Sequence, residues 1–269
     1  MKKKILIVKC NTNDYISKII KKRGYNIEPM YIGGGNKLKR FLRRLFLKYK
    51  LPFYKKWFNK KILNYDVEIV FFYDSLLSES LVEWVNDNMD VKIHVWYWNI
   101  VTNTIQPDKL NDEICSKWSF SSLDAKKYNM KFMAPYFFDE IKCDNENVKY
   151  DILFVGKDKG RLRKLLEYKE TFTNMGFKCK FIITPTRGYH INKHYSKSIS
   201  YEENFKMSCK TKVIFDYIGV NNSGQSMRVM EALFRQKKII TDNILIKNYD
   251  FYRKENIFIL GEDDFKDLN

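Results

Sequence analysis

The stretch from Lys212 to Asn243 decides the fold of this chain. It reads KVIFDY at 212–217, SGQSMRVMEAL at 223–233 and KKIITDN at 237–243. The first run has the apolar composition of a buried strand; a loop of small and polar residues follows, then a helix, then a second strand. The exposed amino terminus of the helix in such a unit is a site for phosphate. We therefore expect a strand–helix–strand unit that binds an anion where its helix begins.

A charged pair marks this helix. Arg228 and Glu231 are three positions apart, so both side chains lie on one helix face, with Gln225 and Ser226 at the helix start. One interpretation is a ligand site. The alternative is an ion pair in solvent, which would contribute only about 0.2–0.5 kcal/mol.

A second charged turn follows the apolar strand YDILFV at 150–155. It begins at Gly156 and opens a helix, so its backbone amides can face an anion while Lys157, Lys159 and Arg161 supply positive charge. The spacing matches neither the Walker A motif nor G-x-G-x-x-G. A solvated loop is the alternative, but the Glu231 segment makes phosphate contact the favoured interpretation.

Strands and helices alternate along the whole chain. In the first half we expect strands at 5–8, 28–32, 67–73, 92–98, 117–121 and 131–134, with helices at 15–22, 37–49, 76–86 and 123–128. In the second half we expect strands at 150–156, 180–184, 212–217, 238–241 and 257–260, with helices at 161–175, at 201–207 and around Glu231. Apolar strands separated by helices indicate an α/β fold with parallel sheets covered on both faces. We place the domains at 1–140 and 150–269, joined by a polar linker at 139–149.

The segment at 223–241 resembles the donor-binding half of GT-B glycosyltransferases, in particular small bacterial enzymes of lipopolysaccharide, O-antigen and capsule assembly. The resemblance is carried by the small-residue loop, Arg228, the Glu-Ala-Leu at 231–233 and the Lys-Lys-Ile-Ile-Thr at 237–241. It implies two Rossmann-like domains with a cleft between them. It also implies that Glu231 binds the ribose hydroxyls of a nucleotide sugar, with Gln225, Ser226 and Arg228 near the diphosphate.

The same family has a Gly-x-x-Lys-x-Arg turn, which corresponds here to Gly156, Lys159 and Arg161. The resemblance therefore implies that this turn, with Lys157, belongs to the donor site. It extends over the whole chain at the level of domains, and only the second half carries motifs. The sequence departs from this family at its end, DDFKDLN at 263–269, where GT-B chains commonly have a helix that crosses back to the first domain. A truncated chain or a very short last helix would explain it.

An inverting transferase needs a base that removes the proton of the acceptor hydroxyl, and the carboxyl end of a strand in the first domain should supply it. Asp74 ends the strand at 67–73 and is the first candidate; an equally good alternative is that it caps the next helix. Asp14, after the first strand, is the second candidate. In a retaining transferase on the same fold, Asp74 would have no such role.

Metal and cofactor chemistry has little support in the sequence. It has neither a D-x-D motif nor G-x-S-x-G. We expect no metal site and no cofactor, because basic side chains can neutralise a leaving diphosphate instead.

The segment from Lys37 to Lys61 is strongly basic. It holds eleven lysines and arginines and no acid, interleaved with leucines and aromatic residues. This composition is typical of a helix on anionic lipid. We single out Lys39, Arg40, Arg43, Arg44, Lys55 and Lys56 as membrane-facing cations. Nucleic acid is the competing polyanion, but no RNP, zinc-finger or helix–turn–helix pattern accompanies the charge, so none is expected as a partner. The plain alternative is a helix that packs its aromatics inward.

Composition sets outer limits on these hypotheses. The chain has 269 residues, 45% hydrophobic, with a formal charge of +17, so it can bury a core and is not disordered. Its five cysteines are scattered without a C-x-x-C pair, so we expect neither disulfides nor zinc, and a reducing cytoplasm. The basic start of the chain has too short an apolar run for a signal peptide, and no apolar run could span a bilayer.

The sequence thus predicts a glycosyltransferase that moves a sugar from a nucleotide-diphosphate donor to a lipid-linked glycan in bacterial surface-polysaccharide synthesis. A UDP-sugar is favoured, with galactofuranose or galactose as candidates, and inversion is favoured over retention. We expect it at the inner face of the plasma membrane. The alternative outside the enzymes is a non-catalytic basic protein that binds lipid or nucleic acid.

Overall fold

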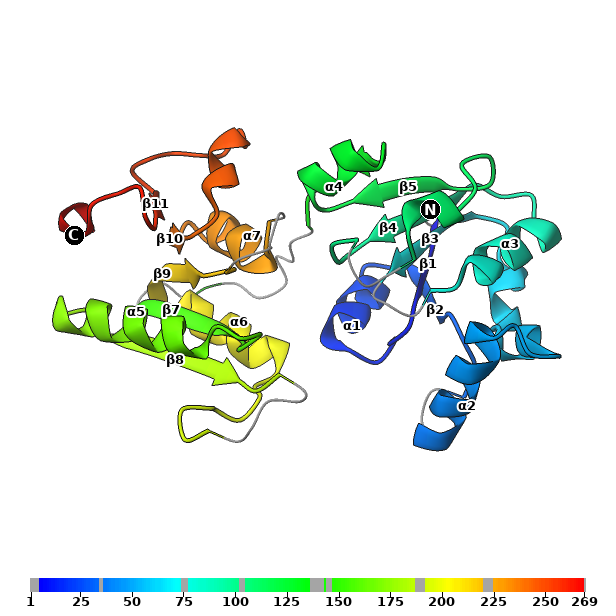
Figure 1. Cartoon of the computed structure of the whole chain (residues 1–269), viewed down its shortest axis with the longest axis horizontal. Coiled ribbons are helices and arrows are strands. Elements are labelled where there is room, and N and C mark those ends of the chain that lie inside the picture. The colour runs from blue at the N-terminus through cyan, green and yellow to red at the C-terminus, as the bar shows by residue number, and fades with distance from the viewer. Residues whose placement is uncertain are drawn as a thin grey trace. The chain divides into compact units, whose positions relative to one another are not determined.

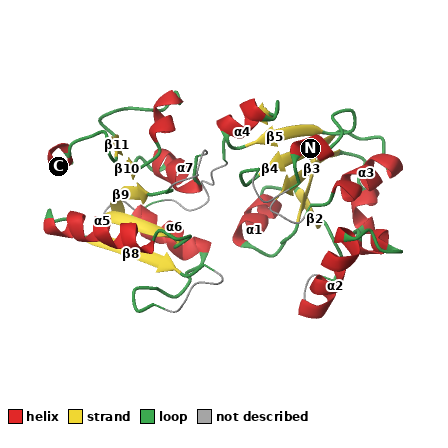
Figure 2. Cartoon of the chain, in the orientation of Figure 1, coloured by secondary structure: helices red, strands yellow, loops and turns green. Residues whose placement is uncertain are grey.

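The computed structural model describes residues 5–33, 36–73, 77–101, 105–135, 143, 147–186, 192–219 and 225–268. The chain divides into two compact units, Met1–Ala134 and Pro135–Asn269. Each unit is a parallel sheet with helices, and strands and helices alternate along both (Figure 2).

The N-terminal unit is built on a sheet whose described strands run in the order β2-β1-β3-β4-β5-β6, all parallel. Its strands are β1 Ile5–Lys9, β2 Asn26–Pro29, β3 Glu68–Tyr73, β4 Ile93–Tyr97, β5 Ser116–Ser119 and β6 Lys131–Phe132. Its helices are α1 Tyr15–Lys22, α2 Lys37–Lys48, α3 Glu79–Asn88 and α4 Ser122–Lys127, with 3-10 turns η1 Tyr54–Trp57, η2 Lys60–Asn64 and η3 Pro107–Lys109 (Figure 1). Along β3 the residues at odd positions are buried in the core, and those at even positions are half-buried.

Local sequence explains most of these boundaries. Helix α1 begins after Asp14, whose carboxylate accepts a hydrogen bond from the Ser17 amide at 2.7 Å. The strand predicted at 28–32 lies instead at Asn26–Pro29, where it pairs with Leu6–Lys9 of β1. The predicted helix at 37–49 is α2, with Asn36 as its amino-terminal cap.

The C-terminal unit is built on a sheet whose described strands run in the order β11-β10-β9-β7-β8, again all parallel. Its strands are β7 Tyr150–Lys157, β8 Cys179–Thr184, β9 Thr211–Asp216, β10 Lys238–Thr241 and β11 Ile257–Ile259. Its helices are α5 Leu162–Asn174, α6 Tyr201–Cys209 and α7 Met227–Phe234, with 3-10 turns η4 Ile244–Asn248 and η5 Phe265–Asp267.

Apolar side chains cover both faces of this second sheet. Ile152 and Phe154 of β7 pack with Phe172 of α5 on one face, whereas Leu153 of β7 packs with Val229 of α7 on the other. Strands buried on two faces read as nearly continuous apolar runs, as the sequence showed. The predicted α/β fold with two parallel sheets is confirmed. Most of the predicted linker at 139–149 lies outside the described residues.

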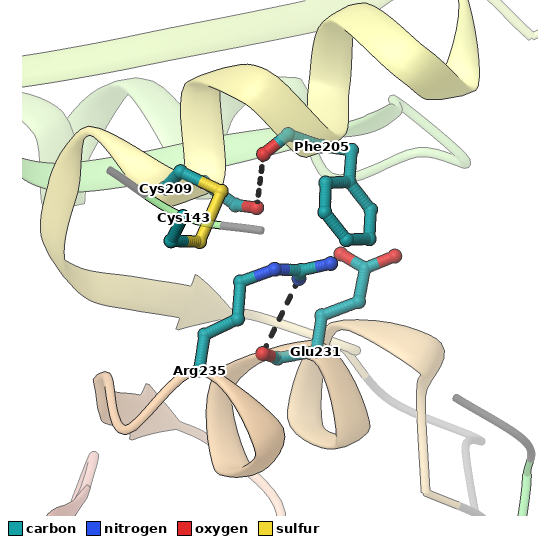
Figure 3. Close-up of a disulfide and its surroundings, with 6 residues drawn as sticks. Cys143, Phe205, Cys209, Glu231 and Arg235 are labelled. Atoms are coloured by element: carbon teal, nitrogen blue, oxygen red, sulfur yellow. Dashed lines mark hydrogen bonds between the residues drawn. A yellow bond between two sulfur atoms is a disulfide. The ribbon is translucent and has the colours of Figure 1, made fainter. Parts of the chain in front are cut away.

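A disulfide joins Cys143 to Cys209, the last residue of α6, with a Cα–Cα distance of 5.0 Å (Figure 3). The expectation of a chain without disulfides is therefore wrong for this pair. The two cysteines are 66 residues apart and belong to no spacing motif, so only the folded chain shows that they meet.

We expect removal of this bond to destabilise the protein. A cross-link over 66 residues restricts the unfolded chain, so Cys143→Ser with Cys209→Ser should lower the free energy of unfolding by about 2–4 kcal/mol. Denaturant titrations with and without reductant measure this. Reductant should destabilise the wild type and leave the double variant unchanged. Equal stability of the two oxidised proteins would contradict the prediction.

Candidate functional site

The candidate site lies at the carboxyl edge of the second sheet, which we define as the edge at which β7, β8, β9 and β10 end. Because the strands are parallel and in register, Lys157 lies beside Thr184, and Thr241 lies beside Asp216. The turn that starts at Gly156 and the loop that leads to α7 therefore meet at this edge. This is where open α/β sheets bind their ligands.

The turn after β7 is held by a buried carboxylate. Asp158 is 2% exposed; one of its oxygens accepts a hydrogen bond from the Leu162 amide and the other from the Tyr195 hydroxyl, each at 2.6 Å. The amide of Lys159 donates to the Thr186 hydroxyl at 2.8 Å. The turn is thus tied to the segment that follows β8, which the sequence did not show.

Arg161 bonds to backbone carbonyls. Its Nε donates to the Asp158 carbonyl at 3.0 Å, its Nη2 to the Lys157 carbonyl at 2.6 Å, and its Nη1 to the Tyr217 carbonyl after β9. These carbonyls are neutral, and the charges of Asp216, Asp242 and Asp158 offset part of the positive charge of the guanidinium. Gly219 has a φ of +76°, and a Cβ there would lie 3.0 Å from the Arg161 side chain, so glycine makes room for it.

Arg228, in the first turn of α7, pairs with a buried carboxylate. Its Nε donates to Asp216 Oδ1 at 2.8 Å, and its Nη1 reaches the Val155 carbonyl at 3.3 Å. A Cβ on Gly156 would lie 3.2 Å from Arg228 Nη1, so this glycine admits the arginine. Arg228 and Arg161 both approach the ring of Phe154, with Cζ 5.4 and 5.9 Å from its centroid.

Four cations therefore gather at the carboxyl edge. Partial desolvation lowers the pKa of Lys159, although the residue is exposed, and the nearby charges of Arg161, Arg228 and Lys157 lower it further. Among the described residues, no carboxylate forms an ion pair with Lys157, Lys159 or Arg161. An anion bound here would relieve this mutual repulsion.

The start of α7 presents further polar groups. The Ser226 hydroxyl donates to Asp216 Oδ1 at 2.6 Å and does not cap the helix. Gln225 is 1% exposed, and in the part of the chain that the structure describes its amide oxygen and nitrogen have no hydrogen-bond partner. A buried amide without partners costs roughly 1–3 kcal/mol, which a ligand that hydrogen-bonds to it would recover.

Glu231 lies on the side of α7 that faces α6. Its carboxylate accepts a hydrogen bond from the Tyr201 hydroxyl at 2.7 Å. Arg235 lies beside it, with Cζ 3.2 Å from the centroid of the Phe205 ring (Figure 3). Burial raises the pKa of Glu231, opposed in part by Tyr201 and by the charges of Arg235 and Arg228. Ribose binding by this residue stays a prediction, and its contacts show a carboxylate that packing holds in place.

The two base candidates belong to the N-terminal unit. Asp74 lies outside the described residues. Asp14 caps α1 through Ser17 and accepts a hydrogen bond from Lys9 Nζ at 2.8 Å. Burial acts to raise its pKa, but the hydrogen bonds from Lys9 and Ser17 hold the pKa below its ordinary value. A carboxylate stabilised in its charged form is a weak proton acceptor, so these contacts favour the capping role.

A basic and apolar surface covers α2 and the residues up to η1; we call it the α2–η1 surface. Leu38, Phe41 and Phe53 are 64%, 57% and 72% exposed on it. The predicted membrane-facing cations are exposed, with one correction: Arg43 is 6% exposed, donates to the Ile32 carbonyl at 3.1 Å and lies over the Tyr31 ring. Arg43 therefore holds α2 to the unit.

Within the described ranges, no helix combines the length and the apolar character that crossing a bilayer requires. The same ranges hold no group of three or more histidine, cysteine or acidic side chains placed to bind a metal ion.

Sequence reasoning missed Asp216, Asp158, Tyr195 and Tyr201. Asp216 had a local signal, because it is a carboxylate that ends a buried apolar strand. The other three had none, because their partners lie 30 or more residues away or are backbone amides.

No family model matches the chain. No curated protein matches it either. Among solved structures, the spinosyn forosaminyltransferase SpnP is 9% identical over 88% of this chain and 80% of that chain, with a TM-score of 0.42. D-2-hydroxyisocaproate dehydrogenase is 12% identical over 88% and 70%, with a TM-score of 0.27. A GtfA/B complex bound to UDP and GlcNAc is 10% identical over 83% and 50%, with a TM-score of 0.28. Similarities of this size identify neither a family nor an activity.

The raised pKa of Glu231 predicts a pH dependence of stability. A carboxyl whose pKa is higher in the folded state favours folding most at low pH, and this contribution is lost as pH rises through the folded pKa. The stability of the wild type relative to Glu231→Gln should therefore fall from pH 4.5 upward and then level off. Denaturant midpoints measured at several pH values test this.

The matched control is Glu167→Gln, on the exposed surface of α5. A hydrogen bond from Lys164 holds the pKa of Glu167 below its ordinary value, so any pH dependence should run in the opposite direction. A flat difference curve for Glu231→Gln would contradict the assignment of a raised pKa.

Proposed function

We propose that the chain is a glycosyltransferase of the GT-B type whose donor is a nucleotide-diphosphate sugar. The observation that carries the proposal is the gathering of Lys157, Lys159, Arg161 and Arg228 at the carboxyl edge, beside the start of α7. A diphosphate carries the negative charge that such a cluster attracts, and it gains charge as it leaves the sugar in the transition state.

The other residues of the edge have roles in this proposal. The buried side-chain amide of Gln225 and the backbone amides at the start of α7 would hydrogen-bond to oxygens of the nucleotide sugar. Ser226, which is bonded to Asp216, would hold the start of α7 in place. Glu231 would bind the ribose hydroxyls. Because side chains neutralise the leaving group, the reaction would need no metal. UDP is the favoured nucleotide, with galactofuranose or galactose as the sugar.

The acceptor half of the reaction belongs to the N-terminal unit in this proposal. We favour inversion, with a carboxylate base that takes the proton of the acceptor hydroxyl. Asp74 remains the first candidate, because both oxygens of Asp14 already accept hydrogen bonds. A retaining reaction on the same fold is the alternative.

The donor site makes a quantitative prediction. Lys159→Gln should weaken nucleoside diphosphate binding about tenfold or more, because a hydrogen bond to a charged group contributes about 1.5–3 kcal/mol. The matched control is Lys212→Gln, an exposed lysine paired with Asp151 where β9 begins, which should bind as the wild type does. Calorimetry with UDP, dTDP and GDP measures both variants.

Turnover is tested in the same set of proteins. Hydrolysis of UDP-, dTDP- and GDP-sugars should be detectable and should survive excess EDTA. Absence of binding and hydrolysis with the whole panel would remove the transferase proposal. Activity lost on chelation and restored by Mg²⁺ or Mn²⁺ would show that a metal neutralises the diphosphate.

We also propose that the protein works at an anionic membrane surface on a lipid-linked glycan of surface-polysaccharide synthesis. The α2–η1 surface carries this proposal, since exposed leucine and phenylalanine side chains alternate on it with lysines and arginines. Apolar side chains can enter the acyl boundary while the cations meet lipid phosphates. A lipid-linked acceptor would be presented at that surface.

Vesicle binding tests this role of the α2–η1 surface. Replacing its cations Lys39, Arg40, Arg44, Lys55 and Lys56 by glutamine should release the protein from anionic vesicles, because each contributes about 1 kcal/mol. The charge-matched control replaces five exposed lysines of α1 and α4, namely Lys18, Lys21, Lys22, Lys126 and Lys127, and should keep binding. Donor binding should be unchanged in both. If the wild-type protein does not bind anionic vesicles at low salt but binds DNA tightly, the membrane proposal is overturned.

A further inference from the structure

We infer that Asp216 is the positioning residue of the diphosphate site, which it controls through Arg228. The inference rests on the proposed function and concerns a residue outside the set that the sequence selected. Asp216 ends β9 and is fully buried, and Arg228 is the donor-site cation that it contacts.

Three donors converge on one oxygen of Asp216. Oδ1 accepts from Ser226 Oγ at 2.6 Å and from Arg228 Nε and Nη2 at 2.8 Å each. The guanidinium is thus held along one side, and its remaining corner, Nη1, points to the Val155 carbonyl and to the space that Gly156 leaves open. Asp216 therefore fixes which edge of Arg228 faces the turn after β7.

Stability alone explains this pair poorly. The Asp216 side chain is buried whereas that of Arg228 is 21% exposed, so the cost of several kcal/mol for removing an ion from water falls mainly on the carboxylate. Oδ2 of Asp216 has no hydrogen-bond partner in the described ranges, so this buried carboxylate is not fully satisfied. A buried carboxylate that leaves one oxygen unused is better explained by its effect on the orientation of the arginine.

The direction of the effect on anion binding separates positioning from charge. Asp216 is negative and lies near the proposed diphosphate, so its charge alone opposes anion binding. If Asp216 acted only through charge, Asp216→Asn would tighten anion binding. If Asp216 positions Arg228, the same change weakens it, because a neutral amide oxygen holds the guanidinium less strongly than a charged carboxylate oxygen does.

The experiment measures UDP, inorganic pyrophosphate and uridine binding to the wild type and to Asp216→Asn by calorimetry. We expect UDP and pyrophosphate to bind about tenfold more weakly and uridine to bind unchanged, since uridine has no phosphate. The matched control is Asp151→Asn, a carboxylate of the same sheet that pairs with Lys212 at the start of β9; its affinities should equal those of the wild type.

Each outcome decides one question. Tighter or equal binding of UDP and pyrophosphate by Asp216→Asn overturns the inference alone, and so does an equal loss for uridine and UDP, which indicates a structural role. Wild-type protein that binds neither UDP nor pyrophosphate overturns the proposed function, and this inference with it. If Asp216→Asn does not fold, Arg228→Lys gives the same test. Lysine keeps the charge and cannot bond to Asp216 through two nitrogens, so unchanged pyrophosphate binding would overturn the inference.

Discussion

The parallel register of the second sheet is the constraint on which the candidate site depends. Strands β7, β9 and β10 run side by side, so their ends meet although they are far apart in the sequence. This alignment brings the turn after β7 to the start of α7. It also places the Val155 carbonyl, which ends the apolar part of β7, within reach of an arginine 73 residues later. No local contact could produce this arrangement.

Carboxylates, buried in the case of Asp158 and half-buried in the case of Asp242, then organise the backbone at that edge. Asp158 accepts bonds from an amide and a tyrosine, and Asp242 accepts the amides of Ile218 and Gly219 at 2.7 Å each. These acids satisfy buried donors, as buried polar groups must. Asp216 forms an ion pair with Arg228, and the charges of Asp216, Asp242 and Asp158 act on Arg161, so at this described edge four cations face three carboxylates. The same groups that stabilise the turns thus leave the site able to attract an anion.

The sequence predicted the features that repeat locally. Apolar runs indicated the parallel strands, and the helix at 15–22 was predicted with the bounds that α1 has. Pairings between distant residues could not be predicted, because periodicity reports only neighbours along the chain: Asp158 meets Tyr195 37 residues away, and Cys143 meets Cys209 66 residues away. Arg43 shows the same limit within one helix. The nearby Arg40 and Arg44 of the same helix are exposed, whereas Arg43 is buried over the Tyr31 ring and donates to the Ile32 carbonyl.

The Cys143–Cys209 bond has a mechanical consequence. It closes a covalent ring that contains β7, α5, β8 and α6, so a force applied to the two ends of the chain passes through the bond and bypasses the segment between two cysteines that are 66 positions apart. An oxidised molecule stretched to its full contour would be shorter by roughly 220 Å than a reduced one, at about 3.3 Å per residue. Two of the five described strands of the second sheet are therefore shielded from tension, and β9, β10 and β11 would be the strands that a pulling force separates.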